Sequence, residues 1–356
     1  MMHFQPPSYL APLLSILRSP MRAASLEDAE WDRVLRMARS ARLHGVLAHR
    51  LRRADTRRLP TGVSSQLESA RAEALHARQM LLYELAQVRQ ALAEVESDVL
   101  LLKGVAYAVQ DLECANGRVP SDLDILVPRE RLQRVEARLL DAGWQETELG
   151  EYDVAYYRRW AHQIPPMRAP GHVMEVDLHH DILPPLGRFA IETQELWEAS
   201  VGLADRLRVL AREDQVLHAV VHLFVDSDCT NRLRDLVDIG SLLTQFQRED
   251  PGFTARLCDR AASLGVTDPL DHAADFLAGW LDVRLLDPHR LANAPRARAV
   301  RALMAQRLAP PDPDAMPHWT DAARALLLGR SLWLRLPPRL GLLHALNKGG
   351  RRIGLH

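Results

Sequence analysis

The feature that most constrains this fold is a change in hydrophobic period, which occurs twice along the chain. Over residues 1–95 apolar side chains recur at helical spacing, which is typical of amphipathic α-helices. Between residues 97 and 180 they gather in short apolar runs bounded by glycine, proline and polar residues, which favours buried strands. From about Leu203 the helical spacing returns. The sequence therefore predicts a small α/β segment between two helical regions.

The N-terminal region contains two clear helix signals. Ser25 and Asp28 have the spacing of a capping box, and Trp31 then starts an apolar face. A break at residues 60–62 precedes a long amphipathic helix. The apolar face of that helix consists of Leu81, Leu85, Val88, Leu92 and Val95.

Four short stretches of the α/β segment are predicted to be strands. They are residues 99–103, 123–127, 154–158 and 173–178. A helix-like stretch over 105–112 follows the first strand, and a predicted helix over 129–140 is closed by Gly143.

The C-terminal region is predicted to be helical, most clearly over residues 213–225 and 231–246. Prolines at positions 310, 311, 313 and 317 mark a further boundary. We therefore expect four segments, 1–95, 96–200, 201–310 and 311–356. The tail from Arg330 onwards is basic and has no acidic residue, so it could contact an anionic partner or a membrane surface. A helix docked on the main body is the preferred interpretation.

The composition excludes several classes of protein. The 45 basic and 46 acidic residues give a net charge of −1, which is no strong nucleic-acid signal. The chain has no apolar run long enough for a transmembrane helix and no convincing signal peptide. Its cysteines, Cys114, Cys229 and Cys258, lie far apart, which suits a reducing compartment, so we expect a cytoplasmic protein. The phosphate-loop, dinucleotide-binding and nucleophile-elbow motifs of other enzyme classes are absent.

The sharpest local signal is the stretch 121–127, in which Asp122 and Asp124 precede an apolar run. Side chains alternate along a strand, so both carboxylates lie on one face, about 7 Å apart from the usual rise per residue. Asp177 lies on a later predicted strand, on the same face as His179. If the two strands pair, the three carboxylates would form a site for two magnesium ions that serves phosphoryl displacement. The alternative for each carboxylate is a solvated strand face.

A strand-to-helix turn provides the other half of the predicted site. Gly104 lets backbone approach a phosphate at a helix N-terminus, and Lys103 adds a positive charge. Arg118 lies four residues before Asp122 and could reach a triphosphate, although a surface loop is the alternative.

Several histidines are further candidates. His218 and His222 have the i, i+4 spacing of a metal pair, but no glutamate follows His218, and packed histidines are the preferred interpretation. His162 and His180 could touch the carboxylate site. His179 could instead orient Asp177 through a hydrogen bond, without binding the metal itself.

Together these residues resemble the DNA-polymerase-β-like nucleotidyltransferase superfamily, and most closely a bacterial family of uncharacterised nucleotidyltransferases. The family's Leu-Lys-Gly turn corresponds to 102–104, its arginine to Arg118, its Asp-x-Asp strand to 122–127 and its Glu-Leu-His-Trp segment to 177–180. The resemblance covers roughly residues 25–245. The chain departs from the pattern in having Val105 after the turn glycine, Asp177 for glutamate and His180 for tryptophan.

The resemblance implies an α+β fold, with a small mixed-sheet nucleotidyltransferase core between N-terminal and C-terminal helical regions. It implies Mg²⁺-dependent transfer of a nucleoside monophosphate from an NTP to an unknown acceptor hydroxyl on a small molecule, peptide or protein. In that reaction Asp122, Asp124 and Asp177 would bind the metal ions. The nucleotide would be bound by Lys103, Gly104, Arg118 and Ser121. The alternative is a non-catalytic nucleotide-binding or protein-interaction module on the same fold.

Overall fold

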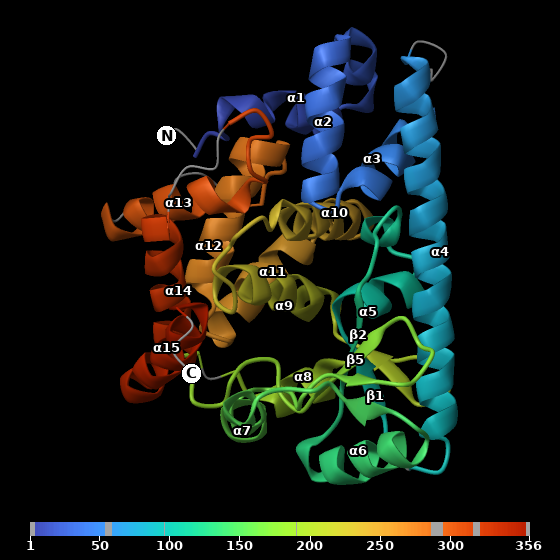
Figure 1. The fold of residues 1–356 in the computed structure, drawn as a ribbon, viewed down its shortest axis with the longest axis vertical. Helices are drawn as coiled ribbons and strands as arrows, with labels where there is room; N and C mark the ends of the chain where they lie inside the picture. The colour runs from blue at the N-terminus through green and yellow to red at the C-terminus, as the bar shows by residue number, and fades with distance from the viewer. Residues whose placement is uncertain are drawn as a thin grey trace.

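Helices surround one mixed β-sheet, as expected for an α+β protein (Figure 1). The computed structural model describes residues 4–53, 59–95, 97–189, 191–285, 295–315 and 321–353. Long helix α4 (Thr61–Ala91) runs the length of the molecule and links the N-terminal helices to the sheet (Figure 1). One connected apolar core joins the N-terminal helices, the sheet and the C-terminal helices.

The N-terminal region is helical, as its apolar spacing predicts. It contains α1 (Ala11–Arg18), α2 (Asp28–Ser40), α3 (His44–Arg50) and the short 3-10 helices η1 (Ser8–Leu10), η2 (Pro20–Ser25) and η3 (Leu51–Arg53). The predicted cap was wrong by two residues. Glu27 and Glu30 form the capping box of α2, whereas Ser25 ends η2 and donates its hydroxyl to Arg22 O.

The sheet has seven strands in the order β3-β4-β5-β2-β1-β7-β6. They are β1 (Val99–Leu101), β2 (Asp122–Leu126), β3 (Gln145–Glu146), β4 (Met167–Arg168), β5 (Glu175–His179), β6 (Val201–Gly202) and β7 (Leu207–Val209). The pairs β2–β5 and β1–β7 are parallel, and the remaining pairs are antiparallel. The sheet is therefore mixed, as expected.

Four helices and two 3-10 turns connect the central strands. They are α5 (Lys103–Val109), η5 (Glu113–Ala115), η6 (Arg129–Arg131), α6 (Leu132–Asp141), α7 (Glu151–Trp160) and α8 (Thr193–Ala199). The turn to α5 and the helix α6 were predicted. Gly143 follows α6 with a φ of 103°, a left-handed conformation that suits a helix-ending glycine.

The predicted strand over 154–158 was wrong, because these residues lie in α7. Valine and tyrosine favour strands, but the charges of this segment favour a helix. Glu151 and Asp153 lie in its first turn and Arg158 in its last, where they complement the helix dipole. Tyr156 and Trp160 also contact each other at the i, i+4 spacing of a helix.

The prediction of helix from Leu203 was also wrong at its start. Residues 201–209 form the hairpin β6–β7, and β7 extends the sheet by pairing with β1. Asp205 and Arg206 turn the chain with φ angles of 58° and 59°. The turn lacks the glycine that usually signals such a hairpin, so local sequence gave little indication of it.

Helices make up the rest of the chain. They are α9 (Arg212–Phe224), α10 (Leu233–Glu249), α11 (Phe253–Ser263), α12 (Thr267–Phe276), the π-helical turn η7 (Leu277–Leu281), α13 (Pro295–Leu308), α14 (Asp321–Arg335) and α15 (Pro338–Ile353). None of the described helices is both long and apolar enough to cross a membrane.

Helix α14, the last but one in the chain, packs against the end of α9. Arg330 donates to Phe224 O at 2.6 Å, Ser331 to Val225 O at 3.0 Å, and Arg335 pairs with Asp226 at 2.9 Å. The first residues of the predicted tail, Arg330 to Arg335, are thus docked on the main body as the end of α14. Pro317 lies outside the described residues, as do the side chains of Lys348, Arg351 and Arg352.

Candidate active site

The two carboxylate-bearing strands are neighbours. Strands β2 and β5 run parallel, and their register pairs Asp124 with Asp177 and Asp122 with Glu175. Leu123 and Ile125 are fully buried on the opposite face of β2, as strand alternation predicts. The expectation that the two strands pair is therefore confirmed.

Asp124, Asp177 and His179 form a compact group at this point of the sheet. One ligand atom from each lies within 4.8 Å of the others, so the group could hold a metal ion. It is the one such group among the residues that the structure describes. Asp122 is outside the group, but its charge is near enough to raise the pKa of Asp177.

Asp124 is held as an anion by two hydrogen bonds. Lys103 Nζ donates to its Oδ1 at 2.9 Å, and His179 Nε2 donates to the same oxygen at 3.1 Å. Burial alone would raise the pKa of the Asp124 carboxyl, but Lys103 and His179 hold it well below its usual value. His179 thus bonds to Asp124, and not to Asp177, the partner expected for it from the sequence.

Asp177 has the opposite electrostatic environment. Burial and the nearby charge of Asp124 raise the pKa of its carboxyl to about 6. Two carboxylates placed in register on adjacent strands repel each other unless a cation lies near them. Lys103 provides one cation here, since its Nζ contacts Asp124, and the raised pKa of Asp177 indicates that negative charge remains in excess.

Lys103 lies at the start of α5, and its backbone has a left-handed φ of 46°. This conformation is uncommon for a residue with a side chain and marks a functional or tightly constrained turn. Burial alone would lower the pKa of its ammonium, but Asp124 raises it above the usual value. Lys103 thus stays charged beside the carboxylates.

Arg118 packs over the glycine of the same turn. A Cβ on Gly104 would lie 2.2 Å from Arg118 Nη1, so only glycine leaves room for the guanidinium here. Arg118 Nε donates to Asp238 on α10 at 2.9 Å, and both side chains are buried. Arg118 is therefore not on a surface loop, and Asp238 is its buried partner.

Four histidines lie around Lys103. The rings of His162 and His179 are 5.3 Å apart, and His222 Nδ1 lies 3.4 Å from Asp226. Burial lowers the pKa of His162 to about 3 and also lowers the pKa values of His218 and His222, with the charge of Lys103 acting in the same direction. His218 and His222 are packed neutral histidines, as preferred. His180 instead lines a separate cavity of about 330 Å³ with Arg129.

Four residues at this site gave no signal in the sequence. Asp226 pairs with Arg335 of α14, and Arg42 donates to Ser121 Oγ at 3.4 Å. Arg234 on α10 lies near Arg118, whose charge acts on it. Only the i, i+4 spacing of His222 and Asp226 could have pointed to one of them, because the other contacts join distant parts of the chain.

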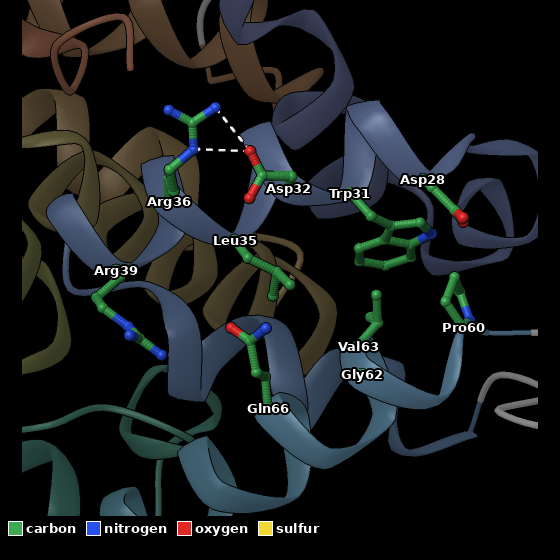
Figure 2. A pocket seen from close by; sticks show the side chains of 10 residues that line it. All are labelled: Asp28, Trp31, Asp32, Leu35, Arg36, Arg39, Pro60, Gly62, Val63 and Gln66. Atoms are coloured by element: carbon green, nitrogen blue, oxygen red, sulfur yellow. Dashed lines mark hydrogen bonds and ion pairs between the residues drawn. The ribbon is translucent and has the colours of Figure 1, made fainter. Parts of the chain in front are cut away.

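A pocket of about 250 Å³ between α2 and the start of α4 lies apart from this site (Figure 2). Trp31 and Val63 line it, as do Arg36 and Asp32, which form an ion pair (Figure 2). None of the residues predicted from the sequence as site residues lines this pocket.

The fold and the carboxylate group agree with the comparison to known protein families. Residues 27–282 match the sequence model of a family described as uncharacterised nucleotidyltransferase. The match covers well over half of the chain, so this protein belongs to that family. The description implies nucleotidyltransferase activity with an NTP as substrate, and names no acceptor. No curated protein and no solved structure gave a significant match.

Proposed function

We propose that this protein is an Mg²⁺-dependent nucleotidyltransferase of the DNA-polymerase-β-like type. It would transfer a nucleoside monophosphate from an NTP to a hydroxyl of an acceptor. The proposal is carried by the in-register placement of Asp124 and Asp177 on neighbouring strands, beside the Lys103–Gly104 turn, in a chain of this family.

The residues fit a magnesium site. Carboxylate oxygens are the ligands that Mg²⁺ prefers. Burial and the charge of Asp124 raise the pKa of Asp177, although Lys103 and His179 act in the opposite direction. Asp122, Asp124 and Asp177 would hold the metal, and His179 would orient Asp124 from behind. Bound magnesium would neutralise phosphate charge and align the attacking and leaving oxygens.

In the reaction the acceptor oxygen would attack the α-phosphorus of the NTP. The bond from that phosphorus to the β-phosphate oxygen breaks, and pyrophosphate leaves with the electron pair. The acceptor proton would pass to Asp177 and then to solvent. Lys103 and the N-terminus of α5 would hold phosphate charge, and most of the catalysis would come from positioning.

The test is labelling of an acceptor from α-³²P-NTP, with magnesium and cell extract as the source of acceptor. Asp124→Asn and Asp177→Asn should each lower labelling by about 10²–10³-fold or more, because each removes charge at the reacting phosphate. Asp141→Asn, an exposed aspartate on α6, is the matched control and should label as the wild type does.

Both variants should remain folded, and circular dichroism checks this. Equal labelling by Asp124→Asn and the wild type would disprove the mechanism. Tight NTP binding by the wild type, with neither labelling nor pyrophosphate release from any NTP, would instead identify a non-catalytic nucleotide-binding module.

A further inference from the structure

Arginines from three distant parts of the chain meet beside the carboxylate group. Arg42 comes from the turn between α2 and α3, Arg118 from the loop before β2, and Arg234 from α10. Arg42 Nη1 lies 3.4 Å from the Ser121 hydroxyl, which immediately precedes Asp122. Arg118 covers Gly104, which immediately follows Lys103. Arg42 and Arg118 therefore contact the residues that adjoin Asp122 and Lys103 in the sequence.

The backbone is built to bring these segments together. Gly45 in α3 and Gly117 in the loop before Arg118 touch through their main chains. A Cβ on Gly45 would lie 2.3 Å from Gly117 O, and Gly117 has a φ of 77°. Glycine at both positions thus lets the Arg42 turn sit against the Arg118 loop.

The arginine group has more positive than negative charge. Arg118 has a close carboxylate partner in Asp238 at 2.9 Å. Among the described residues Arg234 pairs with Asp235 at 3.4 Å, and Asp235 also pairs with Arg232 at 3.2 Å. Burial, followed by the like charge of Arg118, lowers the pKa of the Arg234 guanidinium, and Arg42 acts in the same direction. Asp235 and Asp238 neutralise only part of this positive charge, so an anion bound here would be stabilised.

Arg234 also holds an unused hydrogen-bond donor. Its Nη1 atom is buried and has no hydrogen-bond partner among the described residues. A buried donor without a partner costs about 1–3 kcal/mol, and an anion bound at Arg234 would recover this. Guanidinium forks match phosphate oxygens in geometry and charge.

We propose that Arg42 and Arg234 bind the polyphosphate tail of the nucleotide, and that Asp238 positions Arg118 between them. The identity of the ligand as a nucleotide rests on the proposed function, whereas the affinity for a chain of phosphates rests on the arginine group alone. Phosphates bound here would lie next to Asp122 through Ser121, and next to Lys103 through Gly104. The acidic and basic halves would thus bind magnesium and triphosphate respectively.

The experiment measures tripolyphosphate binding to the full-length protein by calorimetry, in EDTA and without magnesium. Arg234→Gln and Arg42→Gln should each weaken the affinity by about 10-fold or more, and the double variant by about 100-fold, since lost charge-assisted hydrogen bonds have effects of this size. Arg248→Gln on the exposed face of α10 and Arg39→Gln at the end of α2 are matched controls, and should change the affinity less than twofold. Orthophosphate and sulfate should bind at least 10-fold more weakly than tripolyphosphate.

Thermal melting without ligand separates a binding role from a structural one. Arg234→Gln should melt close to the wild-type temperature, because losing the pairing with Asp235 opposes the gain from removing like-charge repulsion and an unpartnered donor. A lower melting temperature with unchanged tripolyphosphate affinity would overturn the inference, as would equal affinity in the wild type and both variants.

The inference and the proposed function can fail separately. Asp124→Asn should bind tripolyphosphate without magnesium at least as tightly as the wild type does. Arginine-dependent tripolyphosphate binding in a protein that transfers no nucleotide would reject the function and keep the inference. Nucleotide transfer by Arg42→Gln and Arg234→Gln with the wild-type KM for NTP would reject the inference and keep the function.

Discussion

Two buried ion pairs flank the start of α5, and they have similar geometry in opposite surroundings. Lys103 Nζ lies 2.9 Å from Asp124, and Arg118 Nε lies 2.9 Å from Asp238. The first pair has the further carboxylates Asp122 and Asp177 near it. The second has the further arginines Arg42 and Arg234 near it, with one further carboxylate, Asp235.

The difference shows why the distance within a pair does not define its role. An ion pair whose surrounding residues have no net charge has mainly a structural role. Excess acid around Lys103–Asp124 favours a bound cation, and excess base around Arg118–Asp238 favours a bound anion. Together the two neighbourhoods are complementary to a magnesium–polyphosphate ligand. Changing one member of each region tests this comparison.

The largest expected effect on stability comes from Arg118. Arg118→Met would leave Asp238 buried without its partner, which should cost about 3–5 kcal/mol of unfolding free energy. The double variant Arg118→Met/Asp238→Leu should recover most of that loss, because neither charge remains. Urea unfolding of the two singles and the double measures the coupling.

Arg248 and Glu113 provide the control for this cycle, because they form an exposed pair at 2.8 Å. Arg248→Met should cost less than about 1 kcal/mol. A cost for Arg118→Met as small as that of Arg248→Met would show that the buried pair does not stabilise the fold.

The next effect is a pH dependence from Asp177. Its pKa is about 6 in the folded protein against a usual value of 3.8, so the folded state binds more protons between these values. The free energy of unfolding should therefore fall as pH rises from about 4 to about 6. Asp177→Asn removes this loss and should be more stable than the wild type at pH 7.5, by up to about 3 kcal/mol, from 1.36 kcal/mol per pKa unit.

Urea unfolding in EDTA at pH 4 and pH 7.5 measures this difference, which should be small at pH 4. Asp124→Asn is the informative contrast, because the pKa of Asp124 is lowered and its ionised form stabilises the fold. It should be less stable than the wild type at pH 7.5. Opposite signs for the two aspartates would support the acid-rich environment, and equal signs would argue against it.

The smallest effect is expected for Ser121→Ala. The bond from Arg42 to the Ser121 hydroxyl is long, at 3.4 Å, and lies in an exposed position. Removing the hydroxyl should change the unfolding free energy by less than about 0.5 kcal/mol. Tripolyphosphate affinity should stay within twofold, since the guanidinium remains. A larger loss of affinity would assign direct phosphate binding to Ser121 and would weaken the role given to Arg42.

Strands of the fold could be predicted where the hydrophobic pattern of a single segment was sufficient to identify them. Alternation along 122–127 placed both aspartates on one face, and the apolar run 99–102 marked β1. Predictions from local composition were wrong where charge or tertiary packing favoured a different secondary structure. Helix α7 contains strand-favouring tyrosines, and β7 is a strand because it pairs with β1, more than a hundred residues earlier.

The site was predictable in part for the same reason. Asp122, Asp124 and Asp177 could be proposed because two short strands carry them at period two. That His179 would donate to Asp124 depended on the strand register, and that Arg118 would meet Asp238 depended on how α10 packs against η5. Neither follows from spacing along the chain.

The sequence by itself determined the order of helical and strand regions, the face on which the paired aspartates lie, and the glycine and lysine at the turn into α5. These are local consequences of backbone geometry, which repeats every two or 3.6 residues. Only the tertiary structure decided which charges meet, since Arg42, Arg118 and Arg234 come together through packing between distant elements. Coulomb energy depends on the distance between charges and on their burial, and neither can be derived from the spacing of residues along a chain.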